Sequence, residues 1–174
     1  MTRRTALLLS GVAALALLFV LASLDDRMRD AGGPGIIGFE LAGSEDSSQE
    51  ILADWGEKGQ DAARLSTRLD FLFLIAYGVF LTLLVGATRD AGRRHGWARV
   101  VAVGGAIGVL PGLAAGFDAL ENVALLTALD GDGGSVAPLL GAIFAGAKFI
   151  LLAIVASYLL AGLAQRVATR RRAA

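Results

Sequence analysis

The chain of 174 residues contains no cysteine and only one histidine, His95. Without cysteine it cannot form disulfides, thiolate nucleophiles, zinc–thiolate sites or iron–sulfur clusters. One histidine cannot supply both axial ligands of a bis-histidine haem within one chain. His95 follows a polar stretch that begins at Arg89, so we expect it to be a solvated loop residue. The sequence predicts neither a metal site nor a cofactor.

The chain also lacks net charge, with 16 basic and 16 acidic residues. A balanced charge favours neither nucleic acid nor an acidic substrate as a partner. Hydrophobic residues make up 55% of the chain, which is too apolar for an ordinary soluble domain of this length. We therefore expect the lipid bilayer to be its solvent.

Four apolar runs are each long enough to supply the roughly 20 residues that a helix needs to cross about 30 Å of hydrocarbon. They predict spanning helices over residues 5–24, 69–87, 99–126 and 138–165. The predicted fold class is all-α, an integral membrane four-helix bundle that forms a single domain over residues 1–174.

The first apolar run also has features of a signal peptide, because Arg3 and Arg4 precede it and Val20 to Ala22 resembles a cleavage site. Its apolar stretch, from Ala6 to Leu24, is longer than the 7 to 15 residues usual for a signal core. This length favours a retained membrane anchor, and cleavage near residue 22 remains the alternative.

Arginines gather on one side of the four-span arrangement. Cytoplasmic segments of membrane proteins carry an excess of Lys and Arg. That side has one acid, Asp90, and the arginines Arg3, Arg4, Arg89, Arg93, Arg94, Arg99, Arg166, Arg170, Arg171 and Arg172. The distribution predicts a multi-pass protein of the inner (plasma) membrane with both termini in the cytoplasm and residues 25–68 in an outer loop.

The outer loop has three parts. A Gly- and Pro-rich turn at residues 31–35 is followed by a short apolar piece, residues 36–41, that either dips into the membrane interface or covers the bundle. Ser47 and Glu50 then have capping-box spacing. They predict an amphipathic helix over residues 48–64 on the outer surface, broken near Gly56 and Gly59, with Trp55 at interfacial depth. A solvated linker is the alternative.

Charged residues inside the apolar runs need a reason, because each costs a few kcal/mol in hydrocarbon (about 3 on insertion scales). The candidate cluster consists of Asp118, Glu121, Asn122, Lys148 and Asp70. The third and fourth runs form a hairpin that turns near residues 131–134, and reflecting position 118 about residue 133 gives 148. We therefore predict a buried ion pair of Lys148 with Asp118, Glu121 or both, with Asn122 supplying hydrogen bonds.

Two neighbouring polar groups have simpler explanations. Asp70 lies near the predicted start of the second helix, where the helix dipole favours a carboxylate. Tyr77 lies inside the second run, where we expect core packing with one hydrogen bond or membership of the polar cluster.

Small residues recur every fourth position along the third run, at Gly104, Gly108, Gly112 and Gly116. Such a stripe lets another helix approach closely. Pro111 lies within it and predicts a kink near the middle of the membrane. The stripe indicates tight packing, and a hinge beside the charged cluster is the alternative.

No residue pattern identifies a reaction, a substrate or a cofactor. The leading interpretation is a non-enzymatic accessory or structural bundle in which the polar cluster fixes helix packing. One alternative is a small transporter or channel component that handles protons or cations through the cluster. Another is a lipid-modifying membrane enzyme with Glu121 or Asp118 as general acid or base. A homo-oligomer or a second membrane protein is the partner that these interpretations allow.

Overall fold

The computed structural model describes residues 2–173 and, over that range, contains helices and no strands. The elements in chain order are α1 (Arg3–Asp30), α2 (Ile36–Glu40), α3 (Glu45–His95), α4 (Ala98–Ile107), α5 (Leu110–Leu129) and α6 (Val136–Ala173). The all-α fold class is confirmed.

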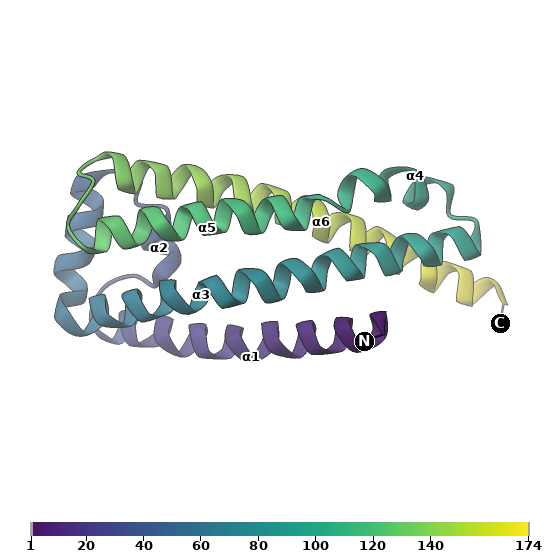
Figure 1. Cartoon of the computed structure of the whole chain (residues 1–174), viewed down its shortest axis with the longest axis horizontal. Helices are drawn as coiled ribbons and strands as arrows, with labels where there is room; N and C mark the ends of the chain where they lie inside the picture. The colour runs from purple at the N-terminus through teal and green to yellow at the C-terminus, as the bar shows by residue number, and fades with distance from the viewer. Residues whose placement is uncertain (1, 174) are drawn as a thin grey trace.

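The long helices pack as a bundle (Figure 1). α1 packs along α3, α3 also packs against α5, and α5 and α6 form an antiparallel hairpin. Four stretches are long and apolar enough to cross a membrane, namely α1, α3, the pair α4 and α5, and α6. Large apolar side chains such as Leu8, Leu72, Leu113 and Ile150 are exposed along all four. The chain is therefore a multi-pass membrane protein whose outer surface suits lipid.

The helices extend beyond the predicted spans. The predicted helix over residues 5–24 continues to Asp30, and the predicted spans 69–87 and 138–165 lie within the longer α3 and α6. Apolar length measures only the part of a helix that suits hydrocarbon, whereas the backbone hydrogen bonds continue into polar sequence.

Residues 48–64 are helical as predicted apart from a bend, but they are the beginning of α3 rather than a separate element. Ser44 caps its first turn by accepting a hydrogen bond from the Ser47 N–H. The chain bends at Gly56, whose φ of 54° and ψ of −167° are essentially restricted to glycine. Gln60 bridges the bend through a 2.9 Å hydrogen bond to the carbonyl of Leu52. The break is therefore at Gly56 and not at Gly59, which is helical.

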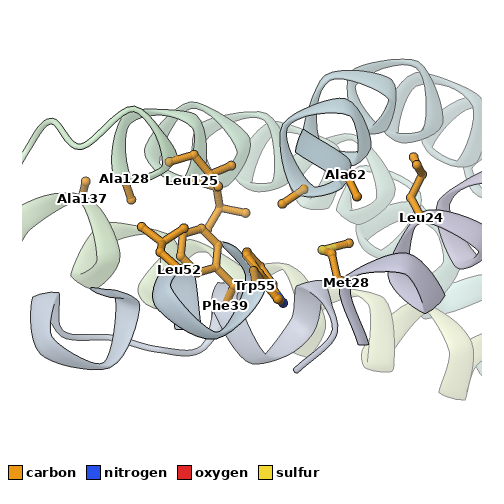
Figure 2. Packing of buried hydrophobic residues seen from close by; sticks show 11 residues of the cluster. Leu24, Met28, Phe39, Leu52, Trp55, Ala62, Leu125, Ala128 and Ala137 are labelled. Carbon is orange, nitrogen blue, oxygen red and sulfur yellow. The ribbon is translucent and has the colours of Figure 1, made fainter. Parts of the chain in front are cut away.

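The first part of α3 crosses the end of the bundle and covers it (Figure 1). Trp55 is consequently 2% exposed, so its side chain lies within the protein and not on its surface. Its ring packs 5.1 Å from that of Phe39 in α2, within a core shared by α1, α3, α5 and α6 (Figure 2). The short apolar piece, residues 36–41, thus covers the bundle.

The third span is interrupted near its middle, as Pro111 predicts. α4 ends at Ile107 and α5 begins at Leu110, and Pro111 lies in the first turn of α5, where the missing N–H costs no helical hydrogen bond. The predicted helix over residues 99–126 is thus two helices, and the change of direction falls at Gly108 and Val109.

Candidate functional site

Lys148 forms the centre of the buried polar cluster. Its ammonium nitrogen Nζ lies 3.0 Å from Asp118 Oδ1, and its distances to the two Glu121 oxygens are 2.9 Å and 2.8 Å. All three residues are buried, with Glu121 fully so. The predicted ion pair between α6 and α5 is therefore confirmed, and Lys148 contacts both acids at once.

The other predicted members extend the cluster to α3. Tyr77 donates a 2.8 Å hydrogen bond to Asp118 Oδ2, so it both packs in the core and joins the cluster. Asn122 Nδ2 donates to Asp70 Oδ2 over 2.7 Å rather than to the Lys148 pair. Three helices therefore contribute polar side chains to one place within the bundle.

The helix-dipole explanation of Asp70 is wrong. α3 begins at Glu45 and bends at Gly56, so Asp70 lies more than three turns inside a continuous helix, where the dipole has little effect. Its partner is the amide of Asn122. The apolar run alone does not show that the helix starts so far upstream.

One member, Glu40, was not predicted. It is the last residue of α2, it is 9% exposed, and its Oε2 lies 3.6 Å from Lys148 Nζ. Among the described residues, that oxygen accepts no hydrogen bond. The one sequence signal is that Glu40 lies in the short apolar piece, residues 36–41, for which covering the bundle was one of two expectations; the sequence does not show that this acid reaches Lys148.

The position of Glu40 is set by two contacts next to the start of α2, one on each side of Gly35. Asp25 of α1 accepts a 2.6 Å hydrogen bond from the backbone N–H of Ile36, at the first turn of α2. The indole N–H of Trp55 donates to the carbonyl of Pro34 over 2.7 Å. α2 is therefore held between α1 and α3, and its C-terminal end points Glu40 at the cluster.

The cluster holds more acid than base, with Glu40, Asp70, Asp118 and Glu121 around the single Lys148. Burial raises the pKa of Glu40 above its ordinary value, and the ammonium of Lys148 opposes that rise. Four carboxylates around one ammonium would leave uncompensated negative charge in a low-dielectric region. The cluster therefore retains protons or needs an additional cation.

An apolar cavity of about 480 Å³ lies next to the cluster and is lined by residues of α1, α2, α3, α5 and α6. Its polar lining residues are Asp25, Glu40, Asp70, Tyr77, Asp118 and Lys148. Its apolar lining includes Leu18, Leu81 and Leu152. The cluster is consequently one wall of a cavity large enough for a small molecule.

The glycine stripe packs closely over only part of its length. A Cβ added at Gly104 would lie 2.5 Å from the Tyr158 hydroxyl oxygen and 3.3 Å from the Cβ of Arg89, so it is α3 that approaches α4 closely there, while Tyr158 of α6 reaches it with the end of its side chain. A Cβ at Gly108 would meet only the backbone of its own helix. At Gly112 and Gly116 it would meet no described atom within 4 Å. The expected close packing thus occurs at Gly104 and not along the whole stripe.

Within residues 2–173, no group of three or more acid or histidine side chains is arranged to hold a metal ion. His95 is exposed and stacks on Trp97. No protein-family model, curated protein or solved structure matches the chain. The geometry of the cluster and its cavity therefore carries the functional argument.

Proposed function

We propose that this protein is a non-enzymatic structural bundle of the membrane in which the Lys148 cluster fixes the packing of the helices. The observation that carries the proposal is the convergence of α2, α3, α5 and α6 on one ammonium group and its carboxylates. Removing one partner of a buried ion pair costs about 3–5 kcal/mol, because the other charge is left unpaired. The cluster therefore selects one arrangement of these helices.

The enzyme interpretation has less support. Glu121 is 0% exposed, and both of its oxygens face Lys148, so a substrate has no route to this carboxylate. Asp118 is engaged by Lys148 and Tyr77 together. Both oxygens of Asp118 already accept hydrogen bonds and Glu121 is fully buried, so neither acid is positioned as the general acid or base that catalysis on a lipid requires.

Oxidative crosslinking tests the structural role, because the chain has no cysteine of its own. A Cβ at Gly78 of α3 would lie 3.3 Å from the Cβ of Ala115 in α5, which is close to disulfide geometry. We expect the variant carrying Gly78→Cys and Ala115→Cys to crosslink rapidly in membranes. Adding Lys148→Met should reduce the yield several-fold, whereas Lys148→Arg should reduce it less. An unchanged yield in the Lys148→Met background would contradict the proposal.

Proton or cation handling is the second candidate function, and the excess of acids over Lys148 favours it. Asp70, Asp118 and Glu40 line the cavity, so an ion can reach them from it. The test is a flux assay in liposomes with a pH-sensitive dye and with potassium or sodium gradients. Proton or cation flux that Asp118→Asn abolishes, while the crosslink between positions 78 and 115 is unchanged, would support this second function. Equal flux with and without protein would exclude it.

We also propose that the arginine-rich end of the bundle faces the cytoplasm of the inner membrane. Excess Lys and Arg near spans sets orientation. Single cysteines test this: Asp132→Cys in the exposed turn between α5 and α6, and Ala168→Cys near the opposite end. A membrane-impermeant maleimide added to intact cells should label only the first. Labelling of the second alone would reverse the orientation.

A further inference from the structure

The cavity between α1 and α6 has a polar end and an apolar end. At the end near α2 its lining includes Asp25, Glu40 and Asp70 beside the apolar Ile36 and Ile37, and deeper in the bundle it is lined by Leu18, Leu81 and Leu152. From Asp70 to Leu81 the helix rises about 16 Å. The cavity therefore runs along the bundle axis and changes from charged to apolar as it deepens.

An amphiphile matches this gradient of polarity. A long apolar chain can lie along α1 and α6 in place of bilayer lipid, and its head then reaches the carboxylates. An uncharged or anionic head group would leave the excess negative charge of the carboxylates unbalanced. A cationic head would supply the charge that Lys148 alone does not.

The unsatisfied carboxylate oxygen of Glu40 points to the same chemistry. Glu40 is 9% exposed and lines the cavity; its Oε2 accepts no hydrogen bond from the described residues, and Lys148 Nζ, 3.6 Å away, is shared with the closer carboxylates of Asp118 and Glu121. A buried acceptor without a donor costs about 1–3 kcal/mol, and more when it is charged. A primary ammonium carries three N–H donors and can supply both the charge and the missing hydrogen bond.

We propose that this cavity binds a membrane amphiphile whose head group is a primary ammonium, taken up laterally between α1 and α6 from the leaflet at the α2 end of the bundle. The ammonium lies between Glu40 and Asp70, and the apolar chain runs toward Leu81. This site goes beyond the structural role proposed above and shares Glu40 with it, but Lys148 contacts Asp118 and Glu121 without a ligand.

Dodecylamine is the probe, with dodecanol and dodecanoate as matched neutral and anionic compounds. Purified full-length protein in a non-ionic maltoside detergent is titrated with each compound. Native mass spectrometry counts the molecules bound, and thermal unfolding is followed in parallel. We expect one dodecylamine to bind per chain with a saturable rise in melting temperature of a few degrees, and no saturable rise with the other two.

Two pairs of variants separate the site from general partitioning into the micelle. Leu18→Trp fills the apolar end of the cavity and should abolish binding, whereas Val20→Trp, 200° around the same helix and exposed, should not. Asp70→Asn removes a negative charge from the cavity but keeps an oxygen that can accept the hydrogen bond from Asn122. This variant should weaken dodecylamine binding about tenfold or more without unfolding the bundle.

The proposal fails if dodecanol binds as tightly as dodecylamine, if Leu18→Trp and Val20→Trp bind equally well, or if no saturable binding occurs. The crosslink between positions 78 and 115 distinguishes this failure from failure of the structural proposal. Intact crosslinking without amine binding overturns the ligand site alone. Amine binding with crosslinking that does not depend on Lys148 overturns the structural role alone.

Discussion

Asn122 donates a 2.7 Å hydrogen bond to Asp70 and so joins α5 to α3 beside the ion pairs of Lys148. Four residues earlier in α5, Asp118 accepts a hydrogen bond from Tyr77, also in α3. Two polar contacts therefore lie along one helix interface. In hydrocarbon each polar group needs a protein partner, so sliding one helix past the other would break both contacts.

Lys148→Met is expected to destabilise the protein by about 3–5 kcal/mol, because it leaves Asp118 and Glu121 buried without their cation. The measurement is unfolding in mixed micelles with increasing fraction of denaturing detergent. Adding Asp118→Asn and Glu121→Gln removes the unpaired charges and should recover part of the loss. If the triple variant is less stable than the single variant, the ammonium is not the partner that these carboxylates need.

Gly56→Ala is expected to cost about 1–3 kcal/mol, because a side chain is strained at the backbone angles of that bend. The bend carries Trp55 into the core beside Phe39, so the substitution should also increase exposure of Trp55. Tryptophan fluorescence, with Trp97 replaced by Phe to isolate the signal, measures this as a shift in emission. Gly112→Ala is the control, since a Cβ there meets no described atom within 4 Å. Equal stability of the two variants would contradict the strain argument.

Glu40 is expected to make stability depend on pH. Because burial raises its pKa in the folded state above the ordinary 4.5, the folded protein binds its proton more tightly than the unfolded chain. The stabilisation that the protonated Glu40 gives the folded state is therefore fully present below pH 4.5, and it is lost as pH rises through the raised pKa. Glu40→Gln cannot lose a proton, so the variant should gain stability relative to the parent as pH rises. Parallel pH dependence of unfolding in parent and variant, from pH 4.5 upward, would rule this out.

The sequence predicted the parts of the site that depend on helix periodicity. Counting along the hairpin paired position 118 with 148, because antiparallel helices of equal rise keep their register. It could not place Glu40, whose position depends on how Asp25 and Trp55 hold α2. The interpretation of Asp70 from the sequence was wrong for a different reason. The apolar run indicates where α3 becomes apolar enough for the membrane, whereas the helix itself begins upstream at Glu45.

Gly104 and Gly116 are expected to respond in opposite ways to alanine, although they share the same sequence spacing. A Cβ at Gly104 would collide with the Tyr158 hydroxyl, itself bonded to the carbonyl of Val100, so Gly104→Ala should cost about 1–3 kcal/mol. A Cβ at Gly116 meets no described atom within 4 Å, and alanine favours helix by up to about 1 kcal/mol over glycine, so Gly116→Ala should be neutral or stabilising. Unfolding of both variants at two protein-to-detergent ratios provides the measurement. A loss at Gly116 that shrinks as the protein is diluted would show instead that this part of the stripe packs against a second copy of the chain, because the parent then also dissociates and loses that contact.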